Sequence, residues 1–381
     1  MEQFRFPTDI RFGCHSLQKA PQWLHEKGFS RPLVVTDQGL VSQPFVQDFV
    51  RLLQQVHMNP VLYADAQGNP VKSCVMDGVK LYQDVHADSV ILIGGGCAMD
   101  VGKAIALMVS HPGDLFDYED GCTDARPVDR DIPFMMAIPT TAGTGSEVGG
   151  SAVISDDLTR AKVIVWSPRL IPNLVVADPA LTIGLPTQVT ITTGIDALVH
   201  NIEAFLAKSY HPLCDGIALE GIFLIFKHLP TAVEYPQNLD ARQGMLMAAM
   251  MGAVAFQKGL GVTHSCAHAL STRFDLHHGL GNALMLLPCL EFNLSAAPDK
   301  FARMGQCIGL QGDTEQQARG FITALAKLYD KMNVRQMIPP YDMTVDDALV
   351  QIAFEDPCHQ HNPRVCTVDD FRLLFEKVMQ H

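Results

Sequence analysis

A carboxylate and an imidazole four residues apart could hold a metal ion. In residues 194–200 (GIDALVH), Asp196 precedes His200 by four positions. On a helix this spacing puts both side chains on one face, about one turn apart. Carboxylate and imidazole ligands suit ferrous iron or zinc, and a set without thiolates argues against a purely structural zinc site. The pair therefore indicates a candidate catalytic metal site.

More histidines follow along the chain and could complete such a site. Four of them are His264, His268, His277 and His278, and the first two repeat the four-residue spacing. A single pair of this kind is more often a pair of surface or capped side chains than a ligand set. Two pairs in apolar helical stretches, followed by His-His-Gly, favour a shared site. The spacing leaves open which of the four histidines bind.

A glycine-rich turn could bind phosphate groups. Residues 89–103 read SVILIGGGCAMDVGK, so an apolar strand enters three glycines and a helix leaves them. Glycines let a backbone approach a phosphate closely, and a helix N-terminus adds free N–H groups and positive potential. The pattern matches neither the G-x-G-x-x-G motif nor a Walker loop. A tight turn without a ligand therefore stays an alternative.

Two other segments could complete a nucleotide site. Residues 139–147 (PTTAGTGSE) offer hydroxyl groups and open glycine backbone, although a serine- and threonine-rich turn would look the same. Asp37 follows the apolar run 32–36 (PLVVT), at the carboxyl end of an expected strand, where α/β sheets bind ligands. A carboxylate there could accept a hydrogen bond from a ribose hydroxyl and would repel a 2′-phosphate. Such a contact would favour NAD over NADP, although an isolated aspartate at a strand end is more often a solvated loop residue.

These groups need a scaffold, and the first half of the chain predicts an α/β domain. Strand-like runs alternate with stretches of helical spacing, which is typical of parallel βαβ units. The expected strands are 32–36, 59–63, 89–93 and 134–138, and the expected helices are 45–56, 71–86 and 98–109.

From about residue 186 the pattern changes to long helical segments, and strand-like runs nearly vanish. The expected helices are 189–209, 213–228, 241–256, 262–273, 314–332 and 345–354. We therefore expect an α/β dinucleotide-binding domain over residues 1–185 and an all-helical domain, which carries the metal, over residues 186–381. No repeat or flexible linker is evident, which predicts two closely packed domains with a cleft between them.

The composition predicts a soluble protein of the cytoplasm. The chain has 381 residues, of which 48% are hydrophobic and 18% charged, and its formal net charge of -13 argues against a nucleic-acid partner. The first residues lack the apolar stretch of a signal peptide, and no uncharged apolar run of about 18 residues predicts a spanning helix. The ten cysteines include no C-x-x-C pair and are expected to be reduced thiols.

With these motifs in view, the sequence resembles the iron-containing (group III) alcohol dehydrogenase family over nearly its whole length. The matching segments are 7–13 (PTDIRFG), 94–103, 139–147, 176–203, 259–283 and 362–364 (NPR). In the fourth of these segments the positions at the spacing of the family signature are Asp178, Pro186, Asp196 and Glu203. The resemblance implies a dehydroquinate synthase-like fold, in which a Rossmann-like α/β domain precedes an all-α metal-binding domain.

The resemblance also implies roles for single residues. The metal ligands would be Asp196, His200, His264 and His278. His268 would lie beside the metal as a candidate proton relay, so the implied catalytic pair is His268 and His278. The matching cofactor positions are Asp37, Asn69, Gly95, Gly96, Cys97, Thr140, Thr141, Thr144, Lys162 and Leu181. Phe256 matches a residue that lines the substrate pocket.

Three positions depart from the family pattern. Cys97 stands where relatives commonly have serine, so the backbone N–H remains but a hydroxyl contact is lost. Gly149 stands where relatives often have threonine, so side-chain contacts to the nicotinamide end differ here. Thr272 is larger than the residue usual at that place in the signature. None of these positions is a metal ligand.

The resemblance implies a metal-dependent, NAD-linked alcohol dehydrogenase that interconverts a small alcohol or diol with its aldehyde or ketone. We expect a divalent metal (ferrous iron first, zinc second), NAD ahead of NADP, a homodimer, and no membrane partner. Other activities on the same scaffold are alternatives: glycerol dehydrogenase, hydroxyacid–oxoacid transhydrogenase and maleylacetate reductase. Dehydroquinate synthase is a related enzyme too, but its basic phosphate-binding residues are not evident in this sequence. A non-catalytic metal- or nucleotide-binding protein is a further alternative, which the retained ligands and loops argue against.

Overall fold

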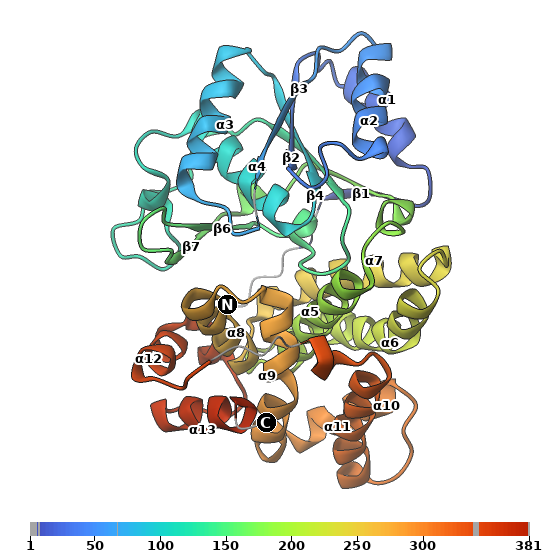
Figure 1. Cartoon of the computed structure of the whole chain (residues 1–381), viewed down its shortest axis with the longest axis vertical. Helices are drawn as coiled ribbons and strands as arrows, with labels where there is room; N and C mark the ends of the chain where they lie inside the picture. The colour runs from blue at the N-terminus through green and yellow to red at the C-terminus, as the bar shows by residue number, and fades with distance from the viewer. Residues whose placement is uncertain (1–5, 7, 67, 338–342, 380–381) are drawn as a thin grey trace. The chain divides into compact units, whose positions relative to one another are not determined.

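The chain folds into two compact units. The computed structural model describes residue 6 and residues 8–66, 68–337 and 343–379 (Figure 1). An α/β unit comprises Phe6–Thr141 and Gly145–Thr182, and a helical unit comprises Ala142–Thr144 and Ile183–His381. Pro7, where the family resemblance begins, lies outside the described residues.

A parallel six-stranded sheet forms the centre of the α/β unit, as the alternating pattern predicts. The strand order is β1-β8-β5-β4-β2-β3, and every pairing in this sheet is parallel. The strands are β1 (Asp9–Phe12), β2 (Pro32–Asp37), β3 (Val61–Ala66), β4 (Ser89–Gly94), β5 (Phe134–Pro139) and β8 (Leu174–Ala177). The helices of the unit are α1 (Ala20–Glu26), α2 (Pro44–Gln55), α3 (Lys72–Asp84) and α4 (Gly96–Ser110).

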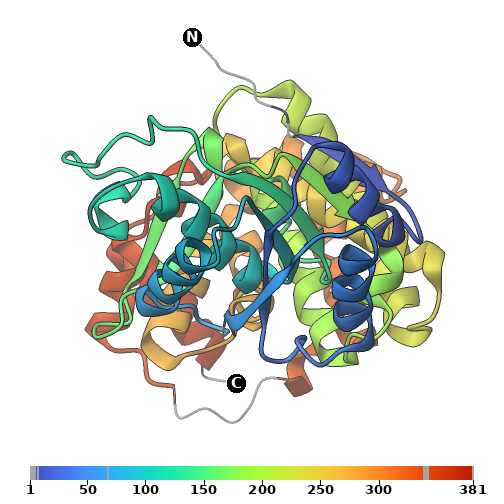
Figure 2. The same ribbon diagram turned by 90° about the horizontal axis from the view of Figure 1, so that it is seen from above.

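Helices cover both faces of this sheet, which explains why its inner strands are apolar throughout. Ile91 and Ile93 of β4 belong to the core that α1 and α2 complete. Leu92, on the other face, packs against α4, where an added Cβ on Gly102 would lie 1.9 Å from Leu92 Cδ2. Glycine at this position therefore lets α4 lie close to the sheet. Figure 2 shows the blue helices α1 and α2 on one side and the cyan helices α3 and α4 on the other.

Several elements of the α/β unit differ from the expectation. β3 begins at Val61, after Pro60, which has no backbone N–H to give to a sheet. Strands β1 and β8, which the pattern did not predict, pair with each other at the sheet edge. A separate antiparallel hairpin consists of β6 (Ser151–Ser155) and β7 (Lys162–Trp166). Short 3-10 turns are η1 (Leu17–Lys19), η2 (Leu115–Tyr118), η3 (Ser146–Val148), η4 (Pro168–Leu170) and η5 (Pro179–Thr182).

The second unit consists of helices in all the elements that the structure describes. They are α5 (Thr187–Leu206), α6 (Pro212–Glu234), α7 (Leu239–Ala255), α8 (Val262–Phe274), α9 (His278–Asn293), α10 (Pro298–Cys307), α11 (Thr314–Lys331), α12 (Asp347–Glu355) and α13 (Val368–Met379). The 3-10 turns are η6 (Phe256–Lys258), η7 (Leu294–Ala296), η8 (Val334–Met337) and η9 (Pro357–His361). Helices α9, α10 and α13 were not predicted, and α9 contains Pro288.

Among the described residues, one helix, α6, is long and apolar enough to cross a membrane by length and composition. It has the length and the mean hydropathy, 1.4, of a membrane-spanning helix, although no uncharged run of that length exists in the chain. The charged residues Asp215 and Glu220 lie within it. In the structure α6 packs against α5 and α7 of the same bundle. Part of its apolar surface, including Ile222, Ile225 and Leu229, is buried, whereas Leu213 and Phe223 are exposed.

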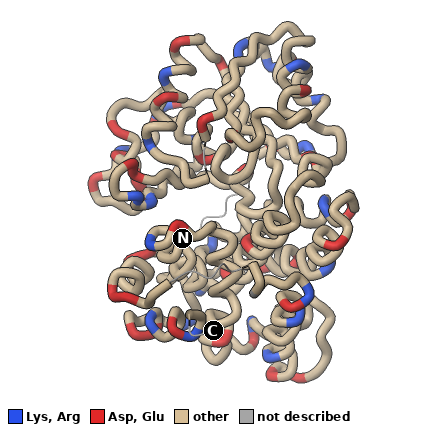
Figure 3. Tube along the Cα trace, viewed as in Figure 1, with Lys and Arg blue, Asp and Glu red and all other residues tan. Residues whose placement is uncertain are grey.

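Charged residues are distributed along both units. Figure 3 shows basic and acidic positions interspersed on the trace of each unit, in keeping with a composition of 28 lysines and arginines against 41 aspartates and glutamates.

Candidate functional site

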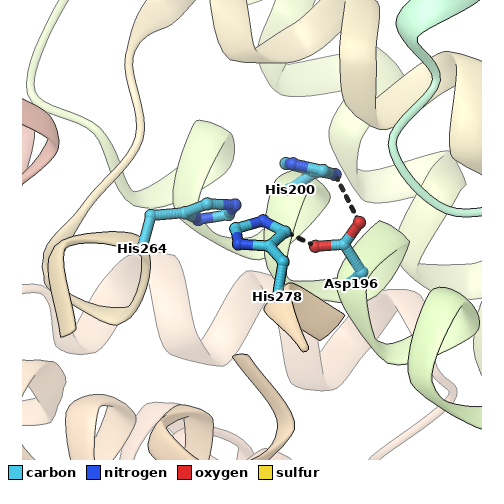
Figure 4. A group of neighbouring side chains, drawn as sticks. All are labelled: Asp196, His200, His264 and His278. Carbon is cyan, nitrogen blue, oxygen red and sulfur yellow. Dashed lines mark ion pairs between the residues drawn. The ribbon is translucent and has the colours of Figure 1, made fainter. Parts of the chain in front are cut away.

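Four side chains from three helices converge in the helical unit. Asp196 and His200 lie one turn apart on α5, His264 lies in the first turn of α8, and His278 begins α9 (Figure 4). Each offers one potential ligand atom, and these atoms all lie within 4.8 Å of one another. The structure therefore brings together the four residues that the resemblance implied as a metal-binding set.

Small residues allow the helices to approach one another at this point. An added Cβ on Gly194 of α5 would lie 2.4 Å from Leu229 Cδ1 of α6. An added Cβ on Gly279, next to His278, would lie 2.6 Å from the carbonyl oxygen of Thr192. Since a side chain at either place would collide with its neighbour, Gly194 allows α6, and Gly279 allows α9, to lie against α5. The second of these contacts puts His278 beside Asp196.

Asp196 is a buried carboxylate surrounded by imidazoles. Its side chain approaches His278 Nε2 at 3.3 Å and His200 Nδ1 at 4.0 Å. Burial opposes its ionisation, yet the attraction of His200, His278 and His264 holds the pKa of Asp196 well below its usual range. The carboxylate is therefore the negative centre of the cluster.

Two of the three imidazoles are held in the form that can bind a metal. Burial lowers the pKa of His200 to about 4 and that of His278 to about 3, although Asp196 opposes both shifts. Both rings are consequently neutral near pH 7, and a neutral ring keeps a lone pair for a metal. Burial also opposes the charging of His264, but the neighbouring Glu203 carboxylate raises the pKa of that ring above its usual value.

The residues present fit a divalent cation. Within the described chain, His200 Nδ1 and Asn282 Oδ1 are buried polar atoms without a hydrogen-bond partner. Such atoms are costly in a protein interior unless something satisfies them. Three imidazoles and one carboxylate form a donor set that suits iron, zinc and similar metals. An ion among these four side chains would neutralise Asp196 and could use the free nitrogen.

Two other buried residues, Asn282 and Glu203, contact the four potential metal ligands, although the sequence alone indicated no role for them. Asn282 Nδ2 donates to Asp196 Oδ1 at 2.7 Å and lies 3.2 Å from His278 Nε2. Glu203 Oε2 accepts from His264 Nδ1 at 2.7 Å. A signal for both exists in the sequence, because Asn282 follows His278 by one helical turn and Glu203 follows Asp196 by two.

His268 lies beside the cluster rather than within it. Its ring stacks on that of His278, with 5.2 Å between centroids, and its Nδ1 contacts Asp356 Oδ2 at 2.7 Å. Asp356 also accepts from the Ser265 hydroxyl and the Cys358 N–H through Oδ1. The thiol of Cys358 lies near enough to the His268 and Asp356 side chains to count as a second group of potential ligands.

Two further residues that the sequence indicated, Phe256 and His277, lie next to the four potential metal ligands. The ring of Phe256, at the end of α7, lies 5.2 Å from that of His200. His277 is the residue that precedes α9, and its carbonyl oxygen accepts from the Leu280 and Gly281 N–H groups. The structure thus separates the two adjacent histidines, because only His278 belongs to the group of four.

In the α/β unit, the glycine turn lies at the carboxyl end of the sheet. Gly94 ends β4 with a φ of 157°, Gly95 precedes α4, and Gly96 and Cys97 begin that helix. Gly95 has Thr141 close by, with an added Cβ only 3.2 Å from the threonine hydroxyl. The turn therefore exposes a helix N-terminus of the kind that binds phosphate groups.

Other cofactor candidates gather at the same edge or at neighbouring turns. Thr140 donates its N–H to the Gly94 carbonyl oxygen at 2.9 Å, and Asp37 ends β2 on the side of Gly94. Asn69 is exposed after β3, and Lys162 begins β7. Leu181 packs against the core under α1 and α2. Thr144 falls in the helical unit and Cys97 is half-buried, a position that raises the pKa of its thiol.

A buried lysine that the sequence analysis left without a role holds the second loop. Lys103 of α4 is fully buried, and its Nζ donates to the carbonyl oxygens of Ser146, Gly149 and Ser151 at 2.6, 2.8 and 2.9 Å. Asp100, one turn earlier, accepts from the Ser146 hydroxyl at 2.9 Å. Helix α4 thus fixes the loop that follows Thr144. The signal was a lysine one turn after an aspartate, within a helix that is otherwise mostly apolar.

Charges around Lys103 are strongly perturbed by burial. Burial lowers the pKa of Lys103 to about 8 and raises that of Glu147 to about 7. It also raises the pKa of Asp100, which Lys103 and the Ser146 hydroxyl oppose. Since Nζ contacts only oxygen atoms, the charged ammonium is the form that the surroundings accept.

Comparisons with known proteins agree along the whole chain. The sequence matches the models of two family regions, Iron-containing alcohol dehydrogenase over residues 7–179 and Fe-containing alcohol dehydrogenase family, C-terminal, over residues 190–379. It is 36% identical to 4-hydroxybutyrate dehydrogenase of Cupriavidus necator, over 97% of both chains, and 32% identical to NAD-dependent methanol dehydrogenase of Bacillus methanolicus, over 100% of both. The solved structure of a 1,3-propanediol oxidoreductase is similar with a TM-score of 0.92 at 30% identity, and the match covers 99% of this chain and 100% of that one.

Proposed function

Because this chain belongs to the iron-containing alcohol dehydrogenase family, we propose that it oxidises a small primary alcohol or diol with NAD, and reduces the aldehyde in reverse. The observation that carries the proposal is the convergence of Asp196, His200, His264 and His278. We propose these four as the ligands of one divalent metal, ferrous iron first and zinc second. We also propose that the boundary between the dinucleotide-binding domain and the metal-binding domain lies at residue 185.

The four ligand side chains would hold a metal cation, to which the hydroxyl oxygen of the alcohol substrate could bind. When bound, the metal supplies Lewis acidity that lowers the pKa of an alcohol, and NAD supplies the hydride acceptor. Asp196 offsets one positive charge, and the neutral rings of His200 and His278 add none. Phe256, beside His200, presents an apolar wall for the carbon chain of the substrate.

His268 is our candidate for the proton relay. Its Nδ1 is held by Asp356, so its Nε2 is left for an exchange with the substrate oxygen or with water. Asp356 is in turn fixed by Ser265 and by the Cys358 N–H, so the ring has one orientation. His278 shares the stacked contact with this ring and acts as a ligand, which is why both histidines belong to the proposed catalytic set.

The names of three relatives support a short substrate with a primary alcohol group. They act on methanol, 1,3-propanediol and 4-hydroxybutyrate by name, which share a primary alcohol group. We expect NADH formation when metal-loaded protein is mixed with NAD and a panel of short primary alcohols and diols, followed by nicotinamide absorbance. The panel without metal is the control. Absence of turnover across the panel in both directions, with metal bound, would contradict the proposal.

The nicotinamide cofactor would be held by the glycine turn and its neighbours. We propose cofactor contacts for the residues that the resemblance implied, namely Asp37, Asn69, Gly95, Gly96, Cys97, Thr140, Thr141, Thr144, Lys162 and Leu181. Support comes from the α4 N-terminus, which offers N–H groups to a pyrophosphate, and from the position of Asp37 at the end of β2.

Asp37 should decide between NAD and NADP. Its Oδ1 accepts from the Leu40 N–H at 2.9 Å, and Oδ2 lies on the Gly94 side, where a ribose hydroxyl could reach it. Asp37→Gly removes that acceptor and the repulsion toward a 2′-phosphate. We expect the ratio of kcat/KM for NADP to that for NAD to rise about tenfold or more, equal to roughly 1.4 kcal/mol. Asp124→Gly, in an exposed loop, is the control. A ratio equal to that of the wild type would remove Asp37 as the discriminator.

We further propose that the protein acts as a homodimer in the cytoplasm, without nucleic-acid or membrane partners. Its net charge of -13 supports the absence of a nucleic-acid partner, since such proteins need a basic face.

A further inference from the structure

We propose that Glu203 is the positioning residue of the metal site, because it fixes the ring of His264 and the first turn of α8 through one carboxylate. This inference rests on the proposed function, since it assigns Glu203 a role toward the metal that the function requires. Neither the family signature nor the ligand set explains why a second carboxylate should lie behind a ligand.

The contact to His264 sets which ring nitrogen is free. Glu203 Oε2 lies 2.7 Å from His264 Nδ1. A carboxylate only accepts hydrogen bonds, so the single proton of the neutral ring must stay on Nδ1. The lone pair is then on Nε2, which lies 3.4 Å from Asn282 Nδ2, the same amide nitrogen that contacts Asp196 and His278. Glu203 thereby directs Nε2 into the cluster of potential ligands.

The same carboxylate holds the start of α8. Its Oε1 accepts from the Thr263 N–H at 2.6 Å, and Oε2 accepts from the Gly261 N–H at 2.9 Å. These groups belong to the end of a helix, where N–H groups have no partner within the helix. An added Cβ on Gly261 would lie 2.9 Å from Oε1, so glycine makes room for the carboxylate. With both oxygens engaged, Glu203 cannot rotate away from His264.

The burial of the charge separates this role from that of an ordinary helix cap. Glu203 is 2% exposed, and among the described residues its ion-pair partner is His264. Serine, threonine or asparagine can cap a helix without a buried charge. A buried carboxylate is costly unless opposite charge is close. A cation on Nε2 of His264 would provide that charge through the ring.

The arrangement also follows from the spacing on α5. Asp196, His200 and Glu203 recur at one and two helical turns, so one face of α5 carries two potential ligands and the carboxylate that orients a third. The face of a single helix therefore controls three of the four proposed ligands.

Glu203→Gln tests the proposal with a side chain of the same size. The glutamine amide must turn its NH2 group either to the α8 N–H groups or to His264 Nδ1. In the second case the ring proton moves to Nε2 and blocks it. We expect the affinity for Co²⁺ to fall by about 10–100-fold. The measurement is a Co²⁺ titration of metal-free protein, followed by visible absorption and by competition with a chelator, without NAD or alcohol.

Asp313→Asn is the matched control, since Asp313 is a carboxylate that caps α11 and contacts none of the four ligands. Its Co²⁺ affinity should equal that of the wild type. If Glu203→Gln lowers the melting temperature of the metal-free protein but binds Co²⁺ as the wild type does, Glu203 only caps α8 and the proposal is overturned. If the wild type itself binds no Co²⁺, Fe²⁺ or Zn²⁺, the proposed function fails as well.

A second measurement applies even if Glu203→Gln does not fold. Zn²⁺-loaded wild-type protein, labelled with ¹⁵N in its histidines, should show His264 with its proton on Nδ1 and its metal on Nε2. The signal is assigned by comparison with His264→Ala. A proton on Nε2 would overturn the role of Glu203.

Discussion

His264→Ala should lose both its bound metal and its alcohol oxidation. His264 provides one of four converging ligand atoms and is 1% exposed, so nothing from solvent readily takes its place. Its removal also leaves the Glu203 carboxylate buried without its partner. Because loss of an outer contact to a ligand already costs about 10–100-fold in metal affinity, loss of the ligand should cost at least about 100-fold. Turnover should fall with the metal content.

The two quantities must be measured on the same preparation. Metal content comes from elemental analysis, and turnover comes from NADH formation with excess alcohol. His111→Ala is the control, because His111 is also buried and makes hydrogen bonds to the Leu107 carbonyl oxygen and the Arg130 N–H, but lies in the α/β unit. It should keep its metal. A His264→Ala protein with full turnover and no metal would show that the ligand assignment is wrong.

Lys103→Met should strongly destabilise the α/β unit. Methionine has nearly the same length but cannot donate, so the carbonyl oxygens of Ser146, Gly149 and Ser151 lose their partner in a fully buried place. Asp100 and Glu147 also lose the positive charge between them. Breaking a buried charged contact from one side costs about 3–5 kcal/mol, so we expect the free energy of unfolding to fall by about that amount.

Urea unfolding measures this change, and a titration with NAD measures its effect on the cofactor loop. We expect weaker NAD binding, because the residues that Lys103 fixes directly follow Thr144. Lys80→Met is the matched control, as Lys80 is an exposed lysine near the end of α3. A Lys103→Met protein whose stability lay within about 1 kcal/mol of the control would show that the three contacts to these carbonyl oxygens contribute little.

The parts of the fold that local pattern encodes were predictable. The runs that became β2, β4 and β5 are apolar because helices cover both sheet faces, and such runs are visible without any partner. β1 and β8 were not predicted, because each is only four residues long. Each forms a strand by pairing with the other, which lies far along the chain. Helix α9 contains Pro288 and two glycines, which weaken its local helix signal although tertiary packing holds the helix.

The residues of the candidate site also fall into two groups, those that local spacing indicates and those that depend on tertiary packing. The spacing of Asp196 and His200 is local, and the sequence indicated it directly. The choice among the later histidines depends on the turn between α8 and α9, and the sequence needed a family resemblance for it. Glu203 and Lys103 contact groups that are distant in the chain, so their burial and partners emerge only from tertiary packing.

The order of the four converging residues along the chain has a mechanical consequence. Asp196 and His200 precede α6 and α7, whereas His264 and His278 follow them. An ion shared by all four would close the intervening chain into a loop, as a removable cross-link does, and would restrict the unfolded state. Helices α10 to α13 lie outside that loop. Bound metal would therefore raise the free energy of unfolding of the segment that contains α6 and α7, in addition to its place in the reaction.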